Sequence, residues 1–304
     1  MNNIYKFCLG TVQLGMDYGV ANKSGKPSLE RAFKMLDYAT NNGIRWFDTA
    51  QAYGNAEEVL GEYLSNRDNL REFHIISKLF PKAFDEGSDC VFKDIEEAVL
   101  YSLKRLNINV LDGFLFHTPE YIYREDLVEQ MIYVKEKGFV RNIGVSIYEK
   151  EHAIDAAGMN WVDYIQIPYS VFDQRLSQTD FFDLTSKNNK KVFARSAFLQ
   201  GLAVMNVSDI PEGLEKAKGY VQELDDLCKR KGFSRLAVSE LFSLNDKRID
   251  FFVFGGDSVQ QLKEVIEVSE REDLPESLKR DLRERFADIE KSVILPNLWD
   301  IKKS

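Results

Sequence analysis

The sequence predicts an α/β protein folded as a (β/α)8 TIM barrel. Three observations predict it: eight short runs rich in β-branched and aromatic residues, segments with helical periodicity between them, and no GxGxxG turn after the first run. Alternating strands and helices require parallel strands, because each helix returns the chain to the same end of the sheet. Eight such units favour a closed barrel over an open sheet, and we expect a single domain over residues 1–304.

The expected strands are separated by segments long enough to hold a helix. They cover Phe7–Leu14, Ile44–Ala50, Phe73–Leu79, Val110–His117, Val140–Ile147, Tyr164–Ser170, Lys191–Ala197 and Asp250–Gly256. The first run continues as Leu14-Gly15-Met16-Asp17-Tyr18-Gly19, which is not the glycine pattern of a doubly wound dinucleotide-binding sheet. The barrel is therefore the better prediction.

The expected helices carry an apolar stripe with helical spacing. The first stripe comprises Leu29, Ala32, Phe33, Leu36 and Ala39, and Ser28 precedes it as the N-cap. A similar stripe lies within residues 56–64. Further helices are expected over 94–106, 124–138, 150–158, 179–189 and 258–269, with additional helices after the seventh strand (213–231 and 235–244) and near the C-terminus (276–290).

Composition excludes several classes of function. Apolar residues make up 44 % of the chain, and 40 Lys and Arg stand against 49 Asp and Glu, for a net charge of −9. This acidic balance argues against nucleic-acid binding, for which a basic face is typical. The three cysteines lie far apart without a CxxC pair, so neither disulfides nor a zinc site is expected. No long apolar stretch or signal peptide is evident, so we expect a cytoplasmic protein without membrane contact.

Ionisable side chains gather where three consecutive expected strands end. Asp48 closes the second strand, Lys78 the third and His117 the fourth, and Tyr53 follows shortly after Asp48. Taken singly, each has an ordinary structural interpretation, such as a turn-forming Asp or a surface Lys. Their coincidence at the end of the barrel where chemistry collects favours a catalytic site. A metal-dependent hydrolase or isomerase is disfavoured, because His117 is the one strand-end histidine.

This combination of residue types indicates proton transfer to oxygen. A buried Asp–Lys pair beside a phenol explains charges within apolar strands, where an unpaired charge is costly. Lys78 is expected to lower the pKa of Tyr53, while Asp48 keeps Lys78 charged. Such a tyrosine donates a proton to a developing alkoxide, and His117 orients the carbonyl oxygen. No side chain supplies a hydride, so a reduction requires a cofactor.

These residues and their order resemble the aldo-keto reductase family. The resemblance spans nearly the whole chain and rests on Phe47-Asp48-Thr49-Ala50, Tyr53-Gly54, Glu58, Leu60-Gly61, Ser77-Lys78, Asp112, His117, Gly144-Val145-Ser146, Gln166, Arg195-Ser196, Gly201 and Gly255–Leu262. It implies a catalytic tetrad of Asp48, Tyr53, Lys78 and His117 and an NADPH-dependent reduction of an aldehyde or ketone. It also implies that the cofactor lies across the mouth of the barrel, without a Rossmann domain.

The resemblance implies specific cofactor contacts. These are Asp48, Ser146, Gln166 and Arg195 around the nicotinamide, Ser196, Phe198, Gln200 and Gly201 along the pyrophosphate, and Gly256, Asp257, Ser258 and Gln261 at the adenosine. Ser258 and Gln261 also fit an S-x-x-Q capping box, which is compatible with a phosphate site at a helix N-terminus.

Several positions depart from the family pattern. Ile147 stands where many relatives have Asn, and Arg195 replaces an aromatic ring. Gln261 and Gly255 stand where an arginine and a lysine are common near the 2′-phosphate, and Asp257 adds a negative charge. NADPH remains the expected cofactor, with NADH as the alternative.

The loops that would shape the substrate pocket are short, which predicts an open mouth. Its candidate lining residues are Met16, Tyr18, Phe80, Tyr169, Phe172 and Trp299. An open pocket near Arg195 favours a small polar or sugar-like carbonyl. The alternative function is a cofactor-binding regulatory or partner-binding protein of the same fold with little turnover. No assembly motif is evident, so we expect a monomer.

Overall fold

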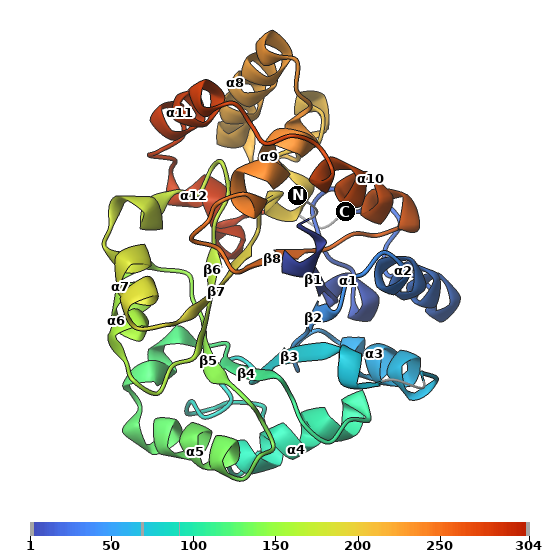
Figure 1. The fold of residues 1–304 in the computed structure, drawn as a ribbon, viewed down its shortest axis with the longest axis vertical. Coiled ribbons are helices and arrows are strands. Elements are labelled where there is room, and N and C mark those ends of the chain that lie inside the picture. The colour runs from blue at the N-terminus through green and yellow to red at the C-terminus, as the bar shows by residue number, and fades with distance from the viewer. Residues whose placement is uncertain (1–2, 68–69, 91, 302–304) are drawn as a thin grey trace.

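The computed structural model describes residues 3–67, 70–90 and 92–301, which form a closed barrel of eight parallel strands (Figure 1). The strands follow one another around the barrel in chain order. They are β1 (Phe7–Gly10), β2 (Trp46–Asp48), β3 (His74–Lys78), β4 (Gly113–Phe116), β5 (Ile143–Ser146), β6 (Tyr164–Pro168), β7 (Lys191–Arg195) and β8 (Phe251–Phe254). The predicted (β/α)8 fold is confirmed, and each strand is shorter than the run that predicted it.

Strand register brings the carboxyl ends of the strands to one rim. Asp48 pairs with Ile76, two residues before Lys78, and Ser146 pairs with Gln166. Along β3, Ile76 packs inside the barrel whereas Ile75 packs against the helices, as the alternation of a strand requires. Lys78 therefore shares the inner side with Ile76, at the mouth of the barrel.

Helices surround the strands. They are α1 (Val12–Gly15), α2 (Leu29–Asn41), α3 (Ala56–Ser65), α4 (Ile95–Leu106), α5 (Glu125–Glu136), α6 (Lys150–Gly158), α7 (Phe181–Lys187), α8 (Glu215–Lys231), α9 (Arg235–Leu244), α10 (Val259–Ser269), α11 (Glu276–Arg285) and α12 (Lys291–Ile294). The extra helices predicted after the seventh strand and near the C-terminus are present as α8, α9 and α11. Figure 1 shows these three helices grouped on one side of the ring.

Two apolar layers hold the barrel together. The inner layer comprises Cys8, Ile76, Leu115, Tyr164, Phe193 and Val253. Phe193 stacks on Phe251 with ring centroids 4.4 Å apart. The larger layer lies between the outer faces of the strands and the helices. The inner side chains make the barrel a packed core, so a ligand can reach only its mouth.

Two segments differ from the predicted elements. Residues 12–15 form α1 instead of extending β1, because Thr11 turns the chain by bonding the Asp48 carbonyl through both its amide and its hydroxyl. Helix α11 ends at Arg285 instead of continuing to residue 290. The next residue, Phe286, leaves the helix and packs edge-on against Phe172, with ring centroids 5.3 Å apart.

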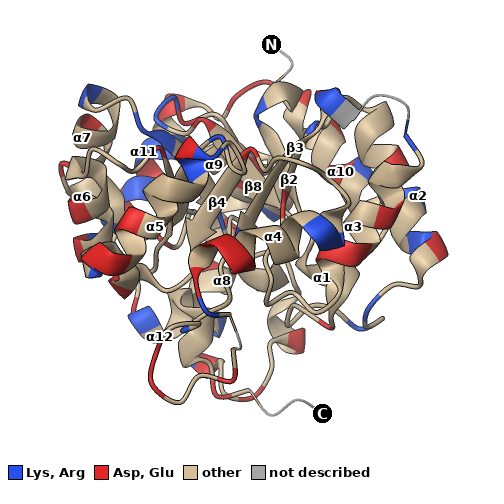
Figure 2. Cartoon of the chain, turned by 90° about the horizontal axis from the view of Figure 1, so that it is seen from below, with Lys and Arg blue, Asp and Glu red and all other residues tan. Residues whose placement is uncertain are grey.

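Side-chain caps begin several helices. Ser28 accepts a hydrogen bond from the Arg31 amide, as predicted, and Asp94 accepts one from the Glu97 amide. Acidic and basic residues are interspersed along the outer helices (Figure 2). Within the residues that the structure describes, no helix is both long and apolar enough to cross a membrane.

Candidate active site

Asp48, Tyr53 and Lys78 meet at the carboxyl ends of β2 and β3. The Lys78 ammonium donates to Asp48 Oδ2 at 2.7 Å and to the Thr49 carbonyl at 2.8 Å, and it lies 3.4 Å from the Tyr53 hydroxyl. These contacts use all three donors of the ammonium, which has no exposed surface. The cation is stable in this position because a carboxylate contacts it directly.

The Tyr53 phenol keeps its proton at neutral pH. Burial, and secondarily the Asp48 carboxylate, raise the pKa of Tyr53 well above its ordinary value. The expectation that the pKa of Tyr53 is lowered overall is therefore wrong, although a nearby cation still favours the phenolate. Burial disfavours the phenolate, and the negative charge of Asp48 counteracts the ammonium. Tyr53 is a proton donor held in contact with a cation that can stabilise its conjugate base.

His117 follows β4 and lies edge-on to Tyr53, with ring centroids 6.0 Å apart. Burial, aided by the Lys78 and Arg195 cations, lowers the pKa of His117 to about 3. The imidazole is therefore neutral and has one N–H donor. Its Nδ1 atom is buried without a hydrogen-bond partner among the described residues. A neutral imidazole beside the phenol suits a hydrogen bond to a carbonyl oxygen.

A further series of hydrogen bonds connects Asp48 to side chains on β6 and β5. Gln166 donates to Asp48 Oδ1 at 2.7 Å, and Ser146 donates to the Gln166 amide oxygen at 3.2 Å. Gln166 is fully buried, so its amide already serves to orient Asp48. Two of the predicted cofactor residues, Gln166 and Ser146, are therefore connected by hydrogen bonds to Asp48, a member of the predicted tetrad.

A cavity of about 560 Å³ opens beside these residues. Most of the predicted site residues line it: Asp48, Tyr53, His117, Ser146, Arg195, Ser196, Phe198, Gln200, Gly201, Gly256, Asp257 and Gln261. Lys78, Gln166 and Ser258 lie outside this lining. Of the lining residues that the sequence did not predict, four have polar side chains: Gln13, Asn22, Tyr148 and Glu264. Glu264 had a signal in the sequence, since it lies three residues after Gln261 on the same face of a helix.

The loop after β7 approaches the cavity in a strained conformation. Ser196, Leu199 and Gln200 have φ values of 66°, 46° and 55°, which side chains with a Cβ rarely adopt. Such backbone strain concentrates at binding sites, where the surrounding structure maintains it. The loop carries Ser196, Phe198, Gln200 and Gly201, for which the family resemblance implies pyrophosphate contacts, to the wall of the cavity.

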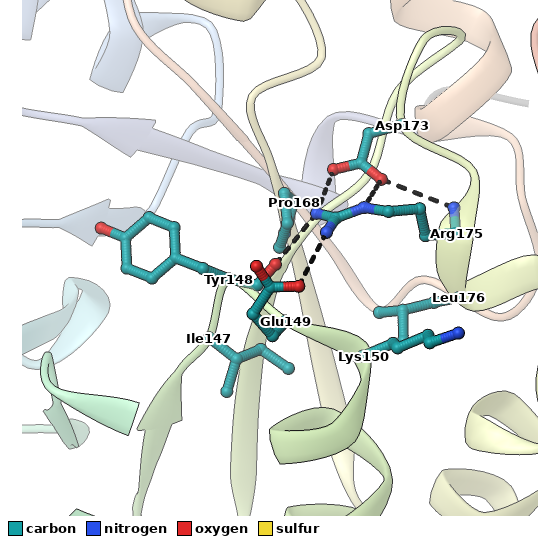
Figure 3. Close-up of a pocket in the computed structure, with 8 residues that line it drawn as sticks. All are labelled: Ile147, Tyr148, Glu149, Lys150, Pro168, Asp173, Arg175 and Leu176. Atoms are coloured by element: carbon teal, nitrogen blue, oxygen red, sulfur yellow. Dashed lines mark hydrogen bonds and ion pairs between the residues drawn. The ribbon is translucent and has the colours of Figure 1, made fainter. Parts of the chain in front are cut away.

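Arg195 is held by neighbours instead of projecting freely. Its guanidinium donates to the Ile147 carbonyl at 2.9 Å and to the Ser196 hydroxyl at 3.1 Å, and it lies 4.6 Å from the ring centroid of Tyr148. Arg175 fixes the loop that bears Tyr148 by donating to the Tyr148 carbonyl at 2.9 Å. Figure 3 shows the Tyr148 ring pointing away from Arg175. Arg195 and Tyr148 thus form a stacked pair at the cavity wall.

The other end of the cavity is formed by the start of α10. Ser258 accepts a hydrogen bond from the Gln261 amide at 3.3 Å, as the predicted capping box requires. The Gln261 side chain, however, accepts from the Asp257 amide at 2.7 Å and not from the amide of Ser258. Asp257 and Glu264 place two carboxylates in this wall. Arg195 is the one cationic side chain among the described residues that line the cavity.

The cavity fits a nicotinamide dinucleotide. Its volume lies in the range of cofactor sites, and five of its lining residues are glycines, which leave backbone groups accessible to phosphates. Gln13 Oε1 is a further polar atom of the lining that is buried without a partner in the described part of the chain. The wall therefore offers backbone, hydroxyl and amide groups for a polar, extended ligand.

The predicted substrate lining is only partly correct. Tyr18 lines the cavity. Tyr169 and Phe172 are buried in the core, where Tyr169 bonds Asp246 at 2.7 Å. Trp299 packs against the core and donates to the Val293 carbonyl. The two buried aromatics lie in the loop that follows β6. The sequence does not distinguish an aromatic residue that packs inward from one that faces the mouth.

The sequence is similar to that of known oxidoreductases. The model of the aldo/keto reductase family matches residues 6–284. An uncharacterised oxidoreductase of Bacillus subtilis, YqkF, is 25 % identical over 88 % of this chain and 92 % of its own length. L-galactose dehydrogenase of Arabidopsis thaliana is 27 % identical over 87 % of this chain and 84 % of its own.

A solved structure supports the fold. An aldo-keto reductase from Bacillus halodurans, determined in its holo form, superposes with a TM-score of 0.74 at 21 % identity, over 95 % of each chain. At that identity, the likeness establishes the barrel and leaves activity to the family match. Since the family model covers nearly the whole chain, the protein belongs to the aldo-keto reductases, oxidoreductases that act on carbonyl groups.

Proposed function

We propose that this protein reduces an aldehyde or ketone to an alcohol with a nicotinamide dinucleotide, and that Tyr53 is the general acid. The observation that carries the proposal is the position of the Tyr53 hydroxyl, 3.4 Å from an ammonium that is itself bonded to Asp48. A protonated phenol donates to the carbonyl oxygen as negative charge develops there. The Lys78 cation then stabilises the phenolate that remains.

The other members of the tetrad support this transfer. Asp48 holds the Lys78 ammonium in place and compensates its charge. The neutral His117 donates a hydrogen bond that orients the carbonyl oxygen toward Tyr53. When bound, the reduced nicotinamide supplies the hydride. Ser146 and the Arg195–Tyr148 pair would hold the nicotinamide end, and the residues of α10 would hold the adenosine end.

The family resemblance leads us to propose NADPH as the reductant, with only a small preference over NADH. Two features of the α10 end limit the preference. Asp257 and Glu264 repel a 2′-phosphate, and the capping bonds of Ser258 and Gln261 already engage two backbone amides. For the substrate, we propose a small polar carbonyl, which is supported by the polar wall and by the relative named as a sugar dehydrogenase.

Replacing Tyr53 by Phe tests the assignment of the general acid. We expect turnover to fall about 10²- to 10⁴-fold, since the proton donor is lost. Titration of cofactor fluorescence should show unchanged cofactor affinity. Wild-type turnover by Tyr53→Phe with any good substrate would contradict the proposed role. If the wild-type protein binds cofactor but turns over no carbonyl in a panel of aldehydes, ketones and sugars, the regulatory alternative is favoured.

A further inference from the structure

A buried polar cluster lies behind the proposed active site, and the chemistry proposed above does not use it. It lies between the outer face of β3 and helices α3 and α4, and it comprises Gln51, Glu57, Ser77, Ser102 and Arg105. Glu57 has no exposed surface and accepts a hydrogen bond from the Ser77 hydroxyl at 2.6 Å. Ser77 immediately precedes Lys78, so the cluster contacts the strand that carries the Lys78 ammonium.

Arg105 connects this cluster to the loop that carries Tyr53. Its guanidinium lies 3.3 Å from Glu57 Oε2 and donates to the carbonyl oxygens of Gln51 and Gly54. These carbonyls stand two residues before and one residue after Tyr53. The same guanidinium donates to Glu58 at 2.7 Å, so a planar, multiply bonded cation spans the loop and the start of α3.

The backbone at both ends of this connection is fixed by close packing. A Cβ at Gly61 would lie 2.3 Å from the Arg105 carbonyl oxygen, so α3 and α4 touch through their backbones there. A Cβ at Gly15 would lie 1.8 Å from the Tyr53 carbonyl oxygen, so α1 also packs directly on the loop. Gly54 adopts a φ of 57°, which favours glycine. The loop is therefore held both by backbone packing on α1 and by the hydrogen bonds from Arg105.

We propose that Arg105, supported by Glu57, is a positioning residue that sets the distance between the Tyr53 hydroxyl and the Lys78 ammonium. The inference rests on the proposed role of Tyr53 as the general acid. The cluster contacts both sides of that pair: the Tyr53 loop through Arg105, and β3 through Ser77. Catalytic groups must be held within about 0.5 Å of their productive position. A substitution at Arg105 should therefore lower the rate of proton transfer by Tyr53, although Arg105 does not contact the substrate.

Substitutions at Arg105 separate positioning from stability. Arg105→Met removes every polar contact, and Arg105→Lys keeps a cation near Glu57 but cannot span the loop. Lys104→Met is the matched control, because it removes an exposed cation from the same turn of α4. Glu57→Gln combined with Arg105→Met removes the carboxylate that would otherwise be buried without its partner. For each variant we would measure kcat, KM, the dissociation constant of the cofactor and Tm.

We expect kcat of Arg105→Met to fall about 10- to 100-fold, with KM and cofactor affinity within about twofold of wild type. Arg105→Lys should regain most of the Tm but little of the kcat, and Lys104→Met should match wild type. The double variant should recover Tm relative to Arg105→Met without recovering kcat. Recovery of kcat in parallel with Tm would overturn the proposal, as would a wild-type kcat in Arg105→Lys or Arg105→Met. If Tyr53→Phe is fully active, the proposed function itself fails, whatever the Arg105 variants show.

Discussion

The two ends of the cavity use their polar groups in different ways. At the barrel end, Lys78 and Gln166 both donate to Asp48 and all three side chains are buried, so few of their groups are left for a ligand. At the α10 end, the carboxylates of Asp257 and Glu264 line the cavity itself. The barrel end is therefore organised before any ligand arrives, which lowers the cost of stabilising charge in a transition state. Among the described residues, the α10 end has no comparable internal network around these two carboxylates, and we expect its side chains to influence cofactor preference.

The largest predicted effect comes from removing one charge of the buried ion pair at the barrel end. Lys78→Met removes a buried cation whose partner Asp48 has no other cation in contact within the described residues. We expect turnover to fall at least 10³-fold, since Tyr53 loses the charge that stabilises its phenolate. The free energy of unfolding should fall by about 3–5 kcal/mol, because Asp48 remains buried without a counter-charge. Steady-state kinetics and urea denaturation measure the two effects.

The double variant Asp48→Asn with Lys78→Met provides the control. It removes both charges, so we expect much of the lost stability to return while turnover stays low. Recovery of turnover in the double variant would contradict the assignment of Lys78 as the group that stabilises the phenolate. Unchanged stability in Lys78→Met would show that the pair is more hydrated than its burial indicates.

The barrel end could be predicted from the sequence because strand register determines it. Asp48 and Lys78 close successive strands and His117 directly follows the next one, and parallel register places such residues on one rim whatever the loops do. The sign of the pKa shift on Tyr53 could not be predicted in this way. Spacing along the chain indicates which charges are neighbours, but the extent of burial depends on the packing of several elements. Burial outweighs the cation in this site.

Titration of the Tyr53 phenol tests whether burial or the Lys78 ammonium determines the direction of its pKa shift. Burial raises the pKa of Tyr53 above its ordinary value, so we expect the phenol of the cofactor-free protein to keep its proton up to about pH 10. We expect the ultraviolet difference spectrum between wild type and Tyr53→Phe to show no phenolate absorbance from Tyr53 below that pH. A phenolate signal that rises between pH 7 and 9 would instead support the original expectation, in which the Lys78 ammonium dominates.

The α10 end was less predictable because its geometry depends on individual side chains. The S-x-x-Q pattern correctly predicted Ser258 as the cap, but the Gln261 side chain bonds the amide one residue earlier than a capping box requires. The sequence also did not show that Gln13 fills the space above Gly255, where a Cβ would lie 2.6 Å from its amide. A lysine at position 255 would require the Gln13 side chain to move.

The smallest predicted effect concerns this end. Asp257→Asn removes one negative charge from the wall that would face the 2′-phosphate. We expect NADPH to bind about three- to tenfold more tightly, since the repulsion between partly exposed charges is modest and screened by salt. NADH affinity should stay within about twofold, and the gain for NADPH should shrink as ionic strength rises.

Fluorescence titration of both cofactors measures this change, with Asp183→Asn, an exposed acid on α7, as the charge-matched control. Equal gains for NADPH and NADH would place Asp257 away from the 2′-phosphate. A wild-type preference for NADPH above a hundredfold would mean that a cation reaches the α10 end when cofactor binds. The α10 end would then not be the acidic wall described here, and the difference between the two ends of the cavity would not hold. A preference below tenfold, sensitive to Asp257 and to salt, would show that the acidic wall at α10 sets the cofactor choice while the preformed barrel end performs the chemistry.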